Sequence, residues 1–337
     1  MLLAELTFAH FAFFIIGLGL VIWGAGIFVS GASRLAVLMK ISPMLVAVTV
    51  VAFASSAPEL FVSLKAALTP NLQNQDQAMG NIIGSNICNI ALVVGLCAII
   101  NPFKMTKKFF SKEYIFFLVS ALLLLVFVYD DYVLQRTEGF ILFTLLIAFF
   151  VFCIRDAKKN PQTVDFIEED ILPDLEARPE GGYKKWVRPI LSLAAGLLAL
   201  VFGSRLVVEN GQMLGGEEGL GFDDKLIGLF VLALGTSLPE LAISVTAALK
   251  KEEDIALGNI VGSNIFNILC VGGLVSSIKP ITVTESMVDY HLSAMLITSF
   301  LLLAFLRMGR SITRWQGTVF LCGYAYYAYA AVYLWRQ

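Results

Sequence analysis

One stretch of this sequence is written twice, which favours folds built from two related halves. The first copy reads Ala52-Phe-Ala-Ser-Ser-Ala-Pro-Glu59 and later Gly80-Asn-Ile-Ile-Gly-Ser-Asn-Ile-Cys-Asn89. The second reads Ala233-Leu-Gly-Thr-Ser-Leu-Pro-Glu240 and later Gly258-Asn-Ile-Val-Gly-Ser-Asn-Ile-Phe-Asn267. Both copies place a carboxylate, hydroxyls and amides within apolar runs long enough to cross a bilayer. Ionisable residues in such runs are costly and usually functional, so the two copies are the candidate functional site.

The composition predicts an integral membrane protein. Of the 337 residues, 58% are hydrophobic and only 15% are charged, whereas about one quarter of a soluble domain is charged. The net charge of -2 gives no indication of a nucleic-acid partner. The five cysteines are scattered through apolar segments without metal-ligand spacing, so we expect small core residues there, not disulfides or a zinc site.

Apolar stretches of about 18–25 residues are typical of membrane-spanning helices. We expect ten of them, at residues 5–30, 42–64, 77–100, 114–130, 137–155, 188–209, 224–249, 254–277, 288–306 and 315–335. They form a first repeat at 1–155 and a second at 188–337, joined by a polar linker at 156–187. The duplicated regions span about 42–101 and 224–280. Because five crossings is an odd number, the second repeat enters the bilayer upside down, which predicts an all-α fold of two inverted five-helix repeats.

The basic residues predict the orientation of these helices. Most of the 24 Lys and Arg residues fall in loops on one side of the predicted helices, and that side is expected to face the cytoplasm. Both termini then lie outside, and the linker 156–187 is cytoplasmic. The linker is rich in Asp and Glu, but it lacks the ligand spacing of an EF-hand loop, so we expect a solvated connection there.

The spacing within the first motif puts its oxygens together. Ser55 and Ser56 precede Glu59 by four and three residues, so the three side chains share one face of a helix. Pro58 lacks an N–H and is expected to bend the helix there. The second copy repeats the arrangement with Thr236, Ser237, Pro239 and Glu240. The later motifs add the pairs Ser85 with Asn89 and Ser263 with Asn267, each four residues apart.

A pocket formed by both copies would be lined by oxygen atoms alone, with no Lys, Arg, His or Cys in a ligand pattern. Such a set suits a hard cation, and Ca²⁺ takes about six to eight oxygens. Two glutamates would balance the charge of one Ca²⁺. Once Ca²⁺ leaves, the carboxylates cannot remain bare in a site of low dielectric constant. Another cation, Na⁺ or H⁺, must then bind, which favours exchange over simple passage.

The pattern Gly-Thr-Ser-x-Pro-Glu followed by Gly-Asn-x-x-Gly-Ser-Asn resembles the two alpha-repeats of the calcium/cation antiporter superfamily. The ten-helix form is similar to the prokaryotic sodium/calcium exchanger branch. The resemblance implies that Glu59 and Glu240 bind Ca²⁺. It implies that the flanking cation sites are lined by Ser55, Ser56, Ser85, Thr236, Ser237 and Ser263 together with the carbonyls of Ala52 and Ala233. Asn89 and Asn267 would be the central amides.

This sequence departs from the family pattern at two positions. Ala54-Ser55 stands where the family usually has Gly-Thr, which keeps the hydroxyl. Asn267 occupies a position that is Asp in some relatives, including potassium-dependent exchangers. With Asn89 also an amide, only two carboxylates remain, which argues against K⁺ co-transport.

We therefore predict an antiporter that exchanges Ca²⁺ for Na⁺ by alternating access in a prokaryotic inner (plasma) membrane. The resemblance further implies that helices 5–30 and 188–209 are candidates for the moving pair, which fits their glycines and their lack of the ligand motifs. Proton-coupled exchange of Ca²⁺ or another divalent cation is the first alternative, and a cation channel is the alternative of another class. An enzyme is not expected, because neither of the two histidines lies in the motifs. The expected partners are Ca²⁺, Na⁺ or H⁺ and the lipid bilayer, with no cofactor, nucleic acid or obligatory protein partner.

Overall fold

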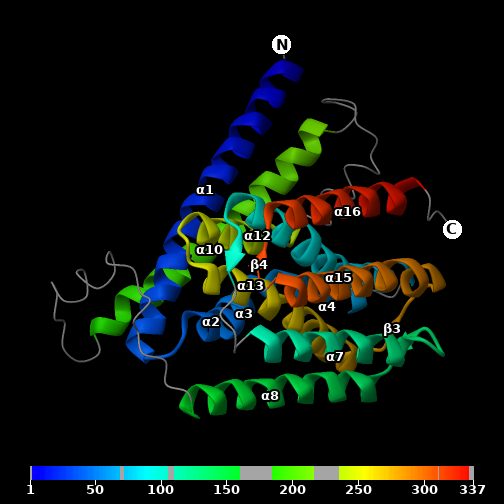
Figure 1. The fold of residues 1–337 in the computed structure, drawn as a ribbon. Helices are drawn as coiled ribbons and strands as arrows, with labels where there is room; N and C mark the ends of the chain where they lie inside the picture. Colours follow the sequence, from blue (N-terminus) through cyan, green and yellow to red (C-terminus); the bar gives the residue numbers. More distant parts are fainter. Residues whose placement is uncertain are drawn as a thin grey trace.

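The chain is almost entirely helical in the computed structural model, which describes residues 2–68, 72–104, 110–159, 184–215, 235–309 and 311–333 (Figure 1). The first half comprises α1 (Leu2–Met39), α2 (Pro43–Val46), η1 (Ala47–Val51), α3 (Ala52–Ser55), α4 (Ala57–Leu68), α5 (Leu72–Ile87), η2 (Cys88–Val93), α6 (Val94–Ile100), β1 (Phe103–Lys104), α7 (Phe110–Val128), β2 (Val133–Leu134) and α8 (Arg136–Lys159). Here η denotes a short π-helical segment.

The second half repeats this order of elements where it is described. It comprises α10 (Lys184–Gly215), α12 (Leu238–Leu249), α13 (Glu253–Phe266), η3 (Asn267–Gly272), α14 (Gly273–Ile278), β3 (Ile281–Thr282), η4 (Met287–Leu292), α15 (Ser293–Gly309), β4 (Ser311–Ile312) and α16 (Arg314–Tyr333). Two small antiparallel strand pairs connect the halves: β1 pairs with β4, and β2 pairs with β3.

The described helices suit a membrane. Six of them are long and apolar enough to cross a bilayer, and the bent pair Pro43–Ser55 and Ala57–Leu68 makes a seventh candidate. Each of the ten predicted ranges contains helix, although residues 224–234 of the range 224–249 lie outside the described residues. Many large apolar side chains are exposed on the outer helices, such as Phe61 at 70% and Ile297 at 67%. That surface fits contact with lipid.

The helix that carries Glu59 breaks where the sequence predicts a bend. Helix α3 ends at Ser55, Ser56 adopts φ -86° and ψ 6°, and α4 begins again at Ala57 with a bend of 41°. Ser237, before α12, has nearly the same angles, φ -88° and ψ 4°. Pro58 and Pro239 each lie in the first turn of the new helix, where a missing N–H costs nothing. The prolines therefore break both copies at equivalent residues.

Helices α1 and α10 pack along each other at a steep angle to α7, α8 and α15 (Figure 1). Gly17 faces Gly203 and Gly24 faces Gly196 across this antiparallel pair. A Cβ atom at Gly24 would lie 2.9 Å from the carbonyl oxygen of Gly196, and one at Gly196 would lie 2.8 Å from that of Gly24. Glycine is therefore what lets the two backbones approach so closely.

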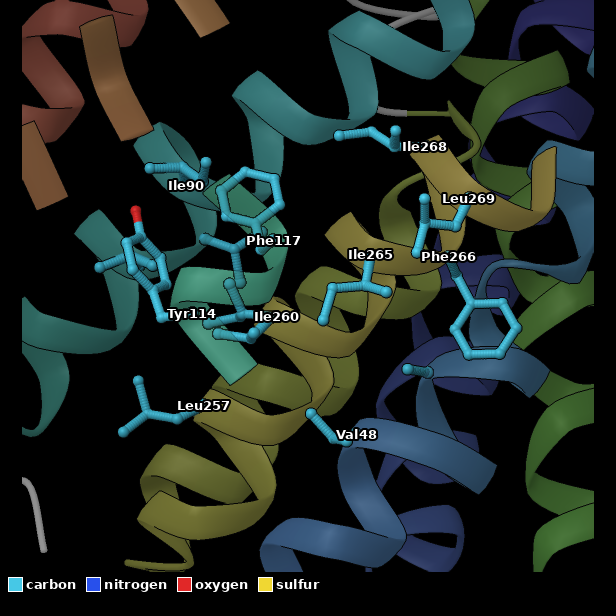
Figure 2. Close-up of a cluster of buried hydrophobic side chains, with 14 of the residues drawn as sticks. Val48, Ile90, Tyr114, Phe117, Leu257, Ile260, Ile265, Phe266, Ile268 and Leu269 are labelled. Atoms are coloured by element: carbon cyan, nitrogen blue, oxygen red, sulfur yellow. The ribbon is translucent and has the colours of Figure 1, made fainter. Parts of the chain in front are cut away.

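The core is built around α13, in which every residue from Ile255 to Phe266 is buried. Figure 2 shows Ile260, Ile265 and Phe266 of this helix in a cluster with side chains of the first half, from η1, η2 and α7. Helix α13 contains the later motif of the second copy from Gly258 to Phe266. The amides and hydroxyls of that motif are therefore held inside the protein and away from lipid.

Candidate cation-binding site

The two motif glutamates are buried in the interior. Glu59 and Glu240 each expose only 1% of their surface, and they lie close enough to interact electrostatically. The Oγ atom of Ser56 donates a hydrogen bond of 3.1 Å to Oε1 of Glu240, so the first copy contacts the carboxylate of the second. Within the described part of the chain, Oε2 of Glu240 and both carboxylate oxygens of Glu59 have no hydrogen-bond partner.

Further polar atoms of the motifs lack partners among the described residues. They are Oδ1 of Asn86, Oδ1 of Asn89, both side-chain polar atoms of Asn267 and Oγ of Ser237. Asn86 lies in α5, and the π-helical segments place the other two amides, since η2 includes Asn89 and η3 begins at Asn267. Segment η2 packs on α12, which carries Glu240, and η3 packs on α4, which carries Glu59. Buried polar atoms rarely go unpaired, and the oxygens among these atoms suit a bound cation.

The structure describes all but one of the remaining predicted ligands. Ser55 is 3.3 Å from Ser263 between their Oγ atoms, which joins the first copy to the second. Ser85 is buried on α5, and Thr236 is half-buried at the break before α12. The carbonyl oxygen of Ala52 accepts hydrogen bonds from the Ser56 N–H at 3.0 Å and from Ser55 Oγ at 3.3 Å. Ala233 lies outside the described residues.

Sequence reasoning missed two asparagines that organise the site. Asn81 Nδ2 donates to the backbone oxygen of Glu59 at 3.2 Å and to Ser63 Oγ at 2.9 Å, while Thr236 donates to Asn81 Oδ1 at 3.1 Å. The second copy repeats this geometry. Asn259 Nδ2 donates to the backbone oxygen of Glu240 at 3.2 Å and to Ser244 Oγ at 2.9 Å, while Ser55 donates to Asn259 Oδ1 at 3.2 Å.

A signal for these residues is present in the sequence. Both later motifs begin with Gly-Asn, and both motif glutamates are followed four residues later by a serine, Ser63 or Ser244. Residues four apart share a helix face, so each serine lies one turn beyond its glutamate. We call each of these two sets an amide bracket. One consists of Asn81, Ser63, the Glu59 carbonyl and the Thr236 hydroxyl, and the other of Asn259, Ser244, the Glu240 carbonyl and the Ser55 hydroxyl.

The comparison with known proteins agrees with the duplicated architecture. The family model described as sodium/calcium exchanger protein matches this chain twice, at residues 9–155 and 188–333. The chain belongs to this family. The resemblance that the motifs indicate is therefore confirmed, and cation antiport is the activity that the family supports.

Relatives of this chain cover nearly all of its length. The putative antiporter CaxA of Alkalimonas amylolytica is 37% identical over 94% of this chain and 97% of its own. The sodium/calcium exchanger MaX1 of Methanosarcina acetivorans is 30% identical over 96% of this chain and 99% of its own. A solved structure of the sodium-calcium exchanger NCX_Mj, soaked with 2.5 mM Na⁺ and 10 mM Sr²⁺, is 29% identical with a TM-score of 0.79, covering 97% of this chain and 99% of that chain.

Proposed function

We propose that this exchanger moves Ca²⁺ in one direction and Na⁺ in the other by alternating access, with both ions bound between the two motif copies. The observation that supports it most directly is the buried pair Glu59 and Glu240, three of whose four carboxylate oxygens lack partners among the described residues. Two carboxylates balance one Ca²⁺, and neutral oxygens complete its coordination. The neutral ligands proposed are Ser55, Ser56, Ser85, Asn89, Thr236, Ser237, Ser263, Asn267 and the carbonyls of Ala52 and Ala233.

The proposed architecture is ten membrane-spanning helices in two inverted repeats, 1–155 and 188–337, joined by a cytoplasmic linker at 156–187. The two family matches at 9–155 and 188–333 support this division. So do the paired helix breaks at Ser56 and Ser237. We propose a prokaryotic inner membrane with both termini outside. The name of a relative that is 34% identical, the inner membrane protein YrbG of Escherichia coli, supports that location.

Helices α1 and α10 are the proposed moving pair. They pack closely on each other through Gly17, Gly24, Gly196 and Gly203. Neither helix bears a proposed ligand, so the pair can shift as a unit while the ligands stay in place. In this proposal Ca²⁺ and Na⁺ are substrates, and neither a cofactor nor a protein partner takes part.

The test is uptake of ⁴⁵Ca²⁺ into proteoliposomes that contain the purified protein and internal Na⁺. Parallel vesicles contain K⁺ instead, or carry a pH gradient without Na⁺. We expect uptake only with internal Na⁺. Uptake driven only by the pH gradient would replace Na⁺ with H⁺ as the coupling ion, and Ca²⁺ current without countertransport would indicate a channel.

Two variants tie the activity to the site. Glu240→Gln removes a carboxylate from the site while keeping its shape, and we expect it to abolish uptake. Glu113→Gln is the matched control, because Glu113 is a fully buried glutamate on α7 outside both motifs, and we expect it to keep uptake. Equal loss in both variants would mean that any buried glutamate is needed for folding, and it would remove the link to the motif site.

A further inference from the structure

The two amide brackets fix the direction of their own hydrogen bonds. The backbone oxygen of Glu59 can only accept, so the Nδ2 side of Asn81 must face it. The oxygen side of the same amide then faces the hydroxyl of Thr236. The chain of bonds continues outward, since Asn81 also donates to Ser63, which donates to the backbone oxygen of Ala78 at 3.4 Å. The orientation of Asn81 is therefore determined by its surroundings.

The fixed amide in turn fixes the hydroxyl that it contacts. A hydroxyl has one hydrogen and two lone pairs. If Thr236 gives its hydrogen to Asn81, only lone pairs remain for any other neighbour, and lone pairs are what a cation requires. Ser55 faces two groups that can only accept, Asn259 Oδ1 at 3.2 Å and the Ala52 carbonyl oxygen at 3.3 Å. Its hydrogen therefore points to one of them, and its lone pairs stay free for a cation. Each amide thus helps to present a hydroxyl of the other motif copy as an acceptor.

We propose that Asn81 and Asn259 are positioning residues that set the affinity for Na⁺ by holding the Thr236 and Ser55 hydroxyls as cation acceptors; the proposal rests on the proposed function. The charge balance shows why Na⁺ is affected more than Ca²⁺. A divalent ion between Glu59 and Glu240 is held chiefly by the two carboxylates. A monovalent ion gains half as much from each charge, so the neutral oxygens contribute a larger share of its binding.

The bracket also connects the ion site to the helix carrying the carboxylate. Each asparagine holds the backbone of the glutamate of its own copy and a hydroxyl of the opposite copy. A cation that pulls on Thr236 or Ser55 therefore acts on the amide that holds a glutamate helix. A role limited to packing two helices would require neither the cross-copy hydroxyl nor its direction.

The test measures Na⁺ binding and transport separately. Purified protein is titrated with NaCl while its melting temperature is measured. A ligand that binds the folded state raises the melting temperature, and the ligand concentration at which the rise occurs reports its affinity. The same variants are assayed for the Na⁺ and Ca²⁺ dependence of ⁴⁵Ca²⁺ exchange. The variants are Asn81→Ala, Asn259→Ala, Thr236→Val and the double variant of Asn81 and Thr236.

We expect Asn81→Ala and Thr236→Val each to weaken Na⁺ about five- to tenfold, the range of one lost hydrogen bond, with less than about a twofold change in the KM for Ca²⁺. The double variant should be no worse than Thr236→Val alone, because both changes remove the same oriented hydroxyl. Thr236→Ser keeps the hydroxyl and should retain the affinity for Na⁺. Ser120→Ala is the matched control, since that buried hydroxyl donates to the carbonyl of Phe116 in its own helix and lies outside both motifs.

Two results would overturn the inference. One is an unchanged affinity for Na⁺ in Asn81→Ala and Asn259→Ala together with a lower maximal rate, which is the behaviour of helix packing alone. The other is an additive double variant, which would mean that the amide and the hydroxyl act separately. The binding titration does not depend on transport. A wild-type protein that binds Na⁺ without exchanging it would contradict the proposed function, and the titration of the variants would still test the role of the amide brackets in Na⁺ binding.

Discussion

The two motif copies agree at their amides and differ at their carboxylates. In both amide brackets the asparagine bonds to the glutamate backbone at 3.2 Å and to the serine at 2.9 Å. At the carboxylates, Glu240 accepts a hydrogen bond from Ser56. Ser237, the equivalent of Ser56, donates no such hydrogen bond to Glu59, whose carboxylate accepts no hydrogen bond from the described residues.

This difference distinguishes contacts that the duplicated sequence determines from contacts that depend on the conformation of the protein. Equivalent residues make equivalent contacts where they hold a helix in place, so the brackets are fixed by the repeated motif. The contacts differ at the carboxylates, where ions are expected to bind. An inverted-repeat transporter is expected to be asymmetric in any one state, because the two halves exchange conformations as it alternates. Variants of equivalent residues can therefore test whether the asymmetry has a function.

The largest effect is expected from the carboxylates. Glu59→Gln and Glu240→Gln each leave one charge to face a divalent ion, and removing one partner of a buried charge pair costs several kcal/mol. We expect each variant to reduce ⁴⁵Ca²⁺ exchange at least about 100-fold. A Glu59→Gln protein that exchanges at more than half the wild-type rate would show that only one copy supplies the Ca²⁺ site.

The next effect concerns the α1–α10 pair, where the two halves are symmetric. Gly24→Ala and Gly196→Ala each place a Cβ atom within 3.0 Å of the facing helix, and overpacking of this kind costs about 1–3 kcal/mol. We expect both to lower the melting temperature in detergent by several degrees and to slow exchange.

Gly19→Ala is the matched control on the same helix, because no atom of the described residues lies within 4 Å of a Cβ atom there. It should behave like the wild type. If Gly24→Ala were as stable as Gly19→Ala, the close packing of the two helices would not be required for folding.

The third effect tests the asymmetry itself. Ser56→Ala removes the hydrogen bond to Glu240, and a bond to a charged group contributes about 1.5–3 kcal/mol. We expect the KM for Ca²⁺ to rise about tenfold or more. Ser237→Ala removes a hydroxyl without such a bond and should change the KM less than about threefold. Equal effects on KM would mean that the two serines exchange roles during the cycle and that this conformation alone does not rank them.

Much of the fold follows from local sequence patterns, and the rest depends on tertiary contacts. Apolar runs give the helices, and Pro58 gives the bend between α3 and α4, because both effects act within one segment. The end of α1 at Met39 was missed, since the sequence predicts an end near residue 30. The polar residue Ser33 interrupts the apolar run, yet it is buried and contacts Glu252 of the second half. Hydropathy cannot anticipate such a contact.

The candidate site divides in the same way. The duplication predicts Glu59, Glu240 and their neighbouring hydroxyls, and the structure brings Ser56 to Glu240 and Ser55 to Ser263. It does not predict the bonding partners of Asn81 and Asn259, because those partners come from the opposite half. The π-helical segments at η2 and η3 are equally invisible in the sequence, since their residues read as ordinary apolar helix.

The smallest effect is expected where the turn between α12 and α13 contacts α1. Lys250 Nζ donates to the backbone oxygen of Gly26 at 3.1 Å and to Ser30 Oγ at 2.8 Å. If α1 moves during transport, as we propose, Lys250→Ala destabilises the conformation described here relative to the alternate one. The apparent Ca²⁺ affinities measured from the two membrane faces should then shift in opposite directions, by about twofold each.

Lys251→Ala provides the control for this comparison, because Lys251 is the neighbouring lysine and its side chain is exposed. It should leave both affinities unchanged. Affinities that move in the same direction on both faces in Lys250→Ala would show a change at the ion site itself. The contact between Lys250 and α1 would then not affect the equilibrium between the two conformations. Helix α1 would no longer be supported as the moving part of the transporter.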